Sequence, residues 1–151
     1  MCLFRKRNPF EKNSKKYIED RFAFLIDRGY ECEYFNRGGE EEFVFAKEHT
    51  NLHKFSFEGL KDLTDKLAKD NVPVYFTIDL DCLDPSVFPG TGTPEAGGVN
   101  FMELLEAIKW VSNTNVVGAD VNELAPMLDA SGASTAVACK VLRELMLGIL
   151  K

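Results

Sequence analysis

The sequence predicts a three-layer α/β fold, in which a parallel sheet is covered by helices. Short runs of β-branched and aromatic residues alternate with longer segments of helical periodicity. Two of these runs are apolar almost throughout, which is typical of parallel strands buried on both faces. A chain of 151 residues is long enough for one such domain with its own core.

Composition limits the kinds of partner that the chain could have. The net charge of −6 argues against nucleic acid as the main partner and is compatible with a cationic small molecule. The four cysteines lie far apart, without zinc-ligand or disulfide-framework spacing, so we expect reduced thiols. No segment has the length and apolarity of a signal peptide or a membrane span. We therefore expect a soluble, cytoplasmic protein with no membrane partner.

The amino-terminal part of the chain contains two predicted helices and one predicted strand. Apolar residues at helical spacing predict a helix over residues 14–28, and alternation over residues 30–35 predicts a half-exposed strand at a sheet edge. A glycine turn then leads to a short helix over residues 40–49. His49 and His53 have a spacing that could bind a metal ion, but no carboxylate accompanies them. We interpret both as exposed residues in a connector.

The carboxyl-terminal part alternates helices with the two most apolar strands. Ser56 begins a helix that leads to a strand over residues 74–78. Asn100 and Glu103 are spaced as a capping box, and the helix that they begin leads to a second strand over residues 116–121. We expect these strands to be parallel, buried neighbours. A last helix covers residues 134–150, and the side chains expected to face the sheet from the three helices are Leu60, Leu63, Leu67, Phe101, Leu104, Leu105, Ile108, Val111, Val137, Val141, Leu142, Leu145 and Ile149.

Acidic residues gather where these two strands end. Asp79 and Asp81 would leave the same face if the first strand continued that far, and Asp84 follows after a turn. Like charges this close favour a hard cation, although an aspartate-rich strand end can also bind nothing or a stray calcium ion. Glu123 follows the second strand and should lie nearby, because carboxyl ends of parallel strands meet at one edge. Its alternative role is that of a capped strand end.

Two segments resemble a known family. Residues 79–98, DLDCLDPSVFPGTGTPEAGG, resemble the D-x-D-x-x-D-P signature and GTGTPE loop of the ureohydrolases, the superfamily of arginases and agmatinases. Residues 117–126, VGADVNELAP, look like the family's next strand. The resemblance implies a partial arginase-like fold and manganese-dependent hydrolysis of a guanidino substrate, agmatine to putrescine and urea. It implies that Asp79 and Asp81 ligate a binuclear manganese centre and that Glu123 holds the guanidinium group. It assigns no catalytic side chain.

The resemblance covers only the carboxyl-terminal half of a ureohydrolase, residues 38–151, and leaves residues 1–37 as a divergent segment of helix plus strand. The G-G-D-H and D-x-H-x-D motifs, which supply the family's other metal ligands, are absent from this sequence. The manganese site is thus incomplete, and we expect a truncated chain that is inactive alone. The alternative is a non-catalytic remnant, or a subunit that assembles with a separate amino-terminal half. The sequence also leaves open whether the chain forms a homo-oligomer.

Overall fold

The computed structural model describes residues 2–6, 30–35, 51–52 and 56–151. Within them one sheet has the order β3-β2-β1-β4-β5. The strands are β1 (Cys2–Lys6), β2 (Tyr30–Phe35), β3 (Asn51–Leu52), β4 (Pro73–Asp79) and β5 (Asn115–Asn122), and the helices are α3 (Leu60–Lys69), α4 (Phe101–Val111) and α5 (Ala133–Ile149). The predicted helices at 14–28 and 40–49 and both histidines lie outside the described residues.

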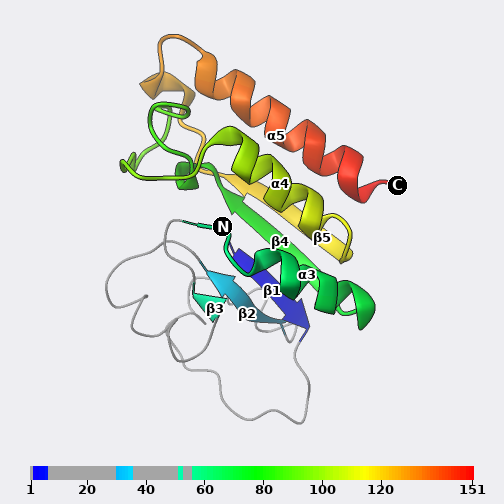
Figure 1. The fold of residues 1–151 in the computed structure, drawn as a ribbon. Helices are drawn as coiled ribbons and strands as arrows, with labels where there is room; N and C mark the ends of the chain where they lie inside the picture. Colours follow the sequence, from blue (N-terminus) through cyan, green and yellow to red (C-terminus); the bar gives the residue numbers. More distant parts are fainter. Residues whose placement is uncertain (1, 7–29, 36–50, 53–55) are drawn as a thin grey trace.

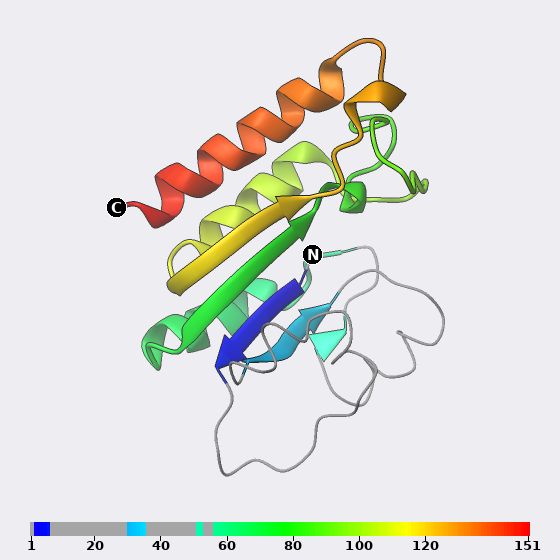
Figure 2. The ribbon, with the colours of Figure 1, turned by 180° about the vertical axis from the view of Figure 1, so that it is seen from behind.

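The labelled helices form one layer against one face of the sheet. Figure 1 shows α3, α4 and α5 in that order across the sheet, and Figure 2 shows the strands in front of them. Helix α4 contacts both α3 and α5. The α/β class is confirmed, with two layers in this part of the chain. No helix in the described ranges combines the length and apolarity needed to cross a membrane.

Strands β4 and β5 are adjacent and parallel, as the sequence predicts. Phe76 pairs with Ala119, and Asp79 pairs with Asn122, so the two strands end side by side. The expectation that the second strand is buried is wrong: β5 is only half-buried, and Val117 is 55% exposed. The reason is its position, because β5 is the last strand in the sheet order.

The sheet is mixed rather than wholly parallel. Strand β1, which its basic sequence does not predict, lies antiparallel to both β2 and β4. Strand β2 occurs where a strand is predicted, but its placement at an edge is wrong. It lies between β1 and the short β3, which pairs in parallel with Tyr34 and Phe35. The alternating pattern of residues 30–35 indicates a strand but not its place in the sheet.

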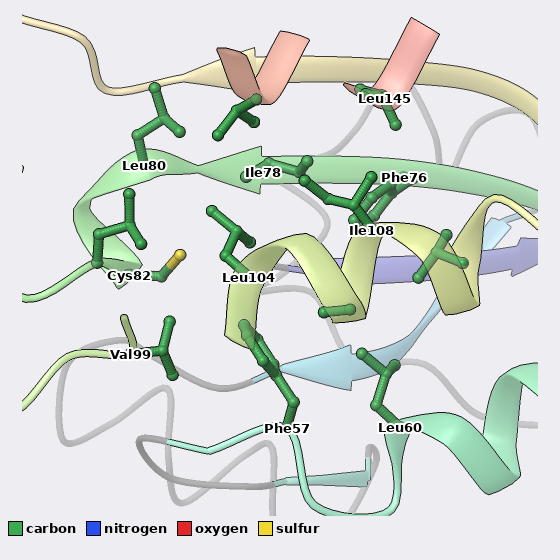
Figure 3. Close-up of a cluster of buried hydrophobic side chains, with 14 of the residues drawn as sticks. Phe57, Leu60, Phe76, Ile78, Leu80, Cys82, Val99, Leu104, Ile108 and Leu145 are labelled. Atoms are coloured by element: carbon green, nitrogen blue, oxygen red, sulfur yellow. The ribbon is translucent and has the colours of Figure 1, made fainter. Parts of the chain in front are cut away.

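The hydrophobic core lies between β4 and the helix layer. Figure 3 shows Phe76 and Ile78 of β4 meeting Leu104 and Ile108 of α4, with Leu145 of α5 beside them. All five side chains are at most 2% exposed. Most of the apolar positions predicted to face the sheet are buried or packed against this cluster.

One predicted core residue of α5 is wrong. Leu142 is 47% exposed, whereas Ala138, Val141 and Leu145 are buried. The buried side chains recur at intervals of three and four residues, which turns Leu142 toward the flank of the helix.

Of two helix starts predicted from capping residues, one is confirmed and one is wrong. Asn100 caps α4, because its side-chain oxygen accepts the backbone N–H of Glu103 at 3.0 Å and the Glu103 carboxylate accepts the N–H of Asn100 at 2.7 Å. The predicted start at Ser56 is wrong. Helix α3 begins at Leu60, after Gly59 adopts a left-handed conformation with φ of 74°. That conformation belongs outside a right-handed helix and favours glycine.

Candidate metal and substrate site

Strand β4 ends at Asp79 and does not continue to Asp81. Residues Leu80–Cys82 form a short 3₁₀ turn, in which the side chains of Leu80 and Cys82 are buried. The two aspartates are half-buried. Asp81 is therefore placed by a turn that the core anchors, and does not share a strand face with Asp79.

The loop over residues 90–95 folds back onto Asp81. The hydroxyl of Thr93 donates a hydrogen bond to Asp81 Oδ2 at 2.9 Å. Asp79, which is half-buried, makes no side-chain hydrogen bond or ion pair with the described part of the chain. This loop thus contributes to the site through Thr93, which residue spacing alone does not indicate.

Asp84 has a structural task in the same loop. Its carboxylate accepts the backbone N–H groups of Ser86 and Gly97, each at 2.9 Å. Hydrogen bonds from Ser86 first, and then from Gly97, lower the pKa of the Asp84 carboxyl below its usual range. A Cβ at Gly98 would lie 2.6 Å from the backbone nitrogen of Asp84, so the chain passes very close there. Asp84 therefore holds its own loop closed through Ser86 and Gly97.

We predict that Asp84→Asn flattens the acid side of the stability profile. A carboxyl group whose pKa is lowered by folding stabilises the protein above its unfolded pKa of about 3.9, and this contribution is lost as the pH falls through the folded pKa. Thermal unfolding from pH 7 to pH 2 should show the parent losing its advantage over the variant below about pH 4. A constant difference between the two proteins across this range would contradict the role given to Asp84.

Glu123 stands at the end of β5 in a strained conformation. It follows Asn122, the partner of Asp79 in the β4–β5 register. Its φ is 68°, in the left-handed region, and its side chain is exposed. This conformation costs a residue other than glycine about 1–3 kcal/mol, and such strain is typical of functional sites. The fold therefore holds an exposed carboxylate beside Asp79 at a cost in stability.

Gly90 joins the loops that follow β4 and β5 to the start of α5. Its N–H donates to the hydroxyl oxygen of Ser134 at 2.8 Å, and its carbonyl accepts the N–H of Ala125 at 2.8 Å. A Cβ at Gly90 would lie 2.7 Å from the Cβ of Ser134. The position therefore requires glycine.

Asp129 holds the other side of this junction. It accepts the N–H of Ser134 at 2.8 Å and the hydroxyl of Ser131 at 2.6 Å. Hydrogen bonds from Ser131 first, and then from Ser134, strongly lower the pKa of the Asp129 carboxyl. The sequence alone does not indicate these roles of Ser134 and Asp129. An aspartate followed after two residues by a serine is a turn signal, but it does not reveal a contact with Gly90.

We predict that Ser134→Ala lowers the free energy of unfolding by about 1–3 kcal/mol, because it leaves the N–H of Gly90 without its acceptor in a buried place. Ser134 is fully buried. The matched control is Thr135→Ala, at the next position of α5, where the side chain is exposed. Urea unfolding of both variants would measure the difference. Equal unfolding midpoints would show that the Gly90 junction contributes nothing to stability.

A polar network crosses β4 and β5 beneath the strand ends. Thr77 donates to Asp120 Oδ1 at 2.7 Å, and the side-chain amide of Asn122 also donates to Asp120. Burial, followed by a hydrogen bond with Asp120, raises the pKa of Tyr75. Asp120 thus ties the strand that ends in Asp79 to the strand that leads to Glu123. The sequence could have indicated a role for Asp120, because it is the charged residue in an otherwise apolar predicted strand.

The sequence predicts that the carboxylates of Asp79 and Asp81 serve as metal ligands and that of Glu123 as a substrate contact. Carboxylate oxygens suit hard divalent cations such as manganese. In the ranges that the structure covers, no three His, Cys, Asp or Glu side chains are grouped so as to hold a metal ion. Glu123 is exposed, and a carboxylate can accept two parallel hydrogen bonds from a planar cation such as guanidinium. Asp79 ends β4, Asp81 lies in the turn after it, and Glu123 follows β5, so the three carboxylates come after the carboxyl ends of neighbouring parallel strands.

Comparison with known proteins gives consistent matches. The profile of the Arginase family matches residues 32–148. The chain is 51% identical over 118 residues to an agmatinase of Bacillus cereus, which covers 76% of this chain and 40% of that protein. It is 42% identical over 93 residues to the N(1)-aminopropylagmatine ureohydrolase of Thermococcus kodakarensis, which covers 58% of this chain and 31% of that protein.

Solved structures agree. A protein of Clostridium difficile assigned as an agmatinase matches with a TM-score of 0.74 and 40% identity, over 94% of this chain and 54% of that one. The arginase of Bacillus caldovelox matches with a TM-score of 0.61 and 27% identity, over 72% of this chain and 40% of that one. The chain spans about 40% of the length of curated agmatinases that it matches.

Proposed function

Because this chain belongs to the arginase family, we propose that it provides one half of an agmatinase-like ureohydrolase site. One observation carries the proposal. The parallel strands β4 and β5 end side by side, with Asp79 on one strand and the strained, exposed Glu123 after the other. A metal ligand and a guanidinium acceptor on neighbouring strands would place the substrate carbon next to the metal. This is the arrangement that hydrolysis of a guanidino group requires.

Asp79 and Asp81 would hold manganese. Among the described residues, Asp79 has no side-chain partner, and Thr93 donates to only one oxygen of Asp81. When bound, a divalent cation lowers the pKa of a water molecule, so that water can attack near neutral pH. Two carboxylates are too few for two ions. We therefore propose that the remaining ligands come from the part of a ureohydrolase that this chain does not match, and that the isolated chain holds fewer than two manganese ions tightly.

Glu123 would select and orient the substrate. A charged, bidentate contact with the guanidinium group fixes its plane, and the net charge of −6 favours a cation. We propose agmatine as the substrate, with putrescine and urea as products. The names of the Bacillus cereus and Thermococcus kodakarensis relatives support this choice, because both specify agmatine or an aminopropyl derivative of it.

A second candidate function is that of a non-catalytic subunit or remnant. The limited match to the relatives, about 40% of their length, favours it as far as the isolated chain is concerned. The two candidates differ in whether activity appears once the remaining ligands are supplied.

The test uses a complemented enzyme. We define this as the chain co-expressed with the portion of the Bacillus cereus agmatinase that precedes the matched region. With manganese present, urea release from agmatine should exceed release from arginine at equal concentrations. Equal or greater release from arginine would overturn the proposed substrate. Absence of urea from either compound, although the two parts form a complex, would favour the non-catalytic subunit.

A further inference from the structure

Glu123 lies between two fixed points of the chain. Before it, Asn122 is the last residue of β5 and is held in the sheet by its pairing with β4. After it, the N–H of Ala125 donates to the carbonyl of Gly90 at 2.8 Å. Only Glu123 and Leu124 separate the two points, so the chain must leave the strand and reach Gly90 within these two residues. The left-handed φ of 68° at Glu123 is part of that turn.

Side chains hold the first of these points. The side-chain amide of Asn122 donates to the Asp120 carboxylate, and it lies 3.4 Å from the hydroxyl oxygen of Thr77, to which it also donates. Thr77 in turn donates to Asp120 Oδ1 at 2.7 Å, and these two residues are partners in the β4–β5 register. A strand end without such contacts opens readily. Asp120 therefore fixes the residue that immediately precedes Glu123.

Burial strengthens the contacts of Asp120. Phe76 and Ile78 point into the core beneath the helices (Figure 3), so Thr77 between them points to the opposite face of the sheet. Thr77 is nevertheless only 3% exposed, and Asp120 is half-buried. A hydrogen bond with Tyr75 adds a further partner to Asp120. Hydrogen bonds in such surroundings are stronger than in water, and a polar group left without its partner there is costly.

We propose that Asp120 is a positioning residue for Glu123. By holding Asn122 at the end of β5, it confines the turn to Glu123 and Leu124 and maintains the left-handed conformation of Glu123. In that conformation the Glu123 carboxylate is exposed beyond the strand end. The hold on the backbone of Glu123 stands on the contacts of this chain alone, whereas its consequence for a guanidino substrate rests on the proposed function.

Urea unfolding of the chain alone measures this hold. Glu123→Gly should unfold at a higher urea concentration than Glu123→Ala, because only glycine adopts the left-handed region without strain. In an Asp120→Ala background this gap should close or reverse, since the turn can relax and glycine then loses more entropy on folding than alanine. In an Asp120→Asn background the gap should persist, because asparagine keeps an oxygen that accepts the hydrogen bonds of Thr77 and Asn122.

A second variant and a matched control make the unfolding test decisive. Asn122→Ala removes the link to Asp120 at an exposed position, so it decides the matter if Asp120→Ala does not fold. Asn115→Ala is the control: Asn115 begins the same strand, and its side chain donates to the carbonyl of Asn71 at 3.5 Å. The gap should close in Asn122→Ala and keep its parent size in Asn115→Ala. A gap that persists in Asn122→Ala, or closes equally in Asn115→Ala, overturns the proposal.

Kinetics of the complemented enzyme separate this inference from the proposed function. Asp120→Ala should raise KM for agmatine about tenfold with little change in kcat or manganese content, and Asp120→Asn should retain the parent KM. Combined with Glu123→Ala, it should add nothing, because both substitutions act through one carboxylate. Urea release with an unchanged KM in Asp120→Ala overturns the positioning role and leaves the function. Absence of urea from the complemented parent overturns the function, while the unfolding gap still decides whether Asp120 holds Glu123.

Discussion

Asp79→Asn should lower kcat/KM of the complemented enzyme for agmatine at least 100-fold, because it removes a proposed metal ligand. Loss of even the hydrogen-bond partners of metal ligands costs about 10–100-fold. Asparagine keeps the shape of the side chain and removes its charge. The fold should tolerate the change, since Asp79 makes no side-chain hydrogen bond or ion pair with the described residues. Manganese content, measured by elemental analysis, should fall together with activity.

The matched control for this variant is Asp70→Asn. Asp70 is also an aspartate at the end of an element, the C-cap of α3, but it is exposed and belongs to no part of the site. Its activity and manganese content should equal those of the parent. If Asp79→Asn retained full manganese and activity, Asp79 would not be a ligand, and the metal would have to be assigned to other carboxylates.

Glu123→Ala should lower kcat/KM about 30-fold, mostly through a higher KM, because hydrogen bonds to a charged group contribute about 2 kcal/mol. Manganese content should remain at the parent value. Glu123→Gly should lose the same substrate contact but raise the free energy of unfolding by about 1 kcal/mol, because glycine adopts the left-handed φ of 68° without strain. Steady-state kinetics and urea unfolding of both variants measure the two effects separately.

The alanine variant serves as the control for the glycine variant. Alanine removes the same carboxylate but keeps a Cβ in the left-handed region, so it should not share the gain in stability. Equal stability of the two variants would mean that the conformation of Glu123 stores no strain. An unchanged KM in both would remove Glu123 from the substrate site and leave it as a strand end.

The parallel pair at the centre of the fold could be predicted because its signals are local. Val74 to Ile78 form an apolar run, and the capping box of Asn100 and Glu103 starts the helix that connects this strand to the next. One connecting helix between two strands makes them parallel neighbours. The residues expected to form the site lie at the ends of these strands for the same reason.

The burial of β5 could not be predicted, because it depends on which strands exist beside it. An apolar run reads the same in the middle of a sheet and at its edge. The antiparallel β1 was not predicted for a related reason: it pairs with β2 and β4, which are distant in the sequence, and Arg5 and Lys6 give it no apolar strand pattern. Long-range order in a sheet is a property of the assembled chain rather than of any window of sequence.

The contacts that hold the site residues in place could not be predicted from local sequence patterns either. Ser134 lies 44 residues from Gly90, and Asp120 lies 43 residues from Thr77. Each contact joins loops or strands whose proximity follows only from the fold. Asp84 could be identified as acidic but not as the residue that closes the loop, because its partner Gly97 comes close only after a bend.

Urea release tests whether this chain holds one half of a ureohydrolase site. The purified chain alone, saturated with manganese, should release no urea from agmatine above the uncatalysed rate. The complemented enzyme should release it at an enzymatic rate under the same conditions. Urea release by the chain alone, abolished by Asp79→Asn, would contradict the claim and show that the residues present form a complete site.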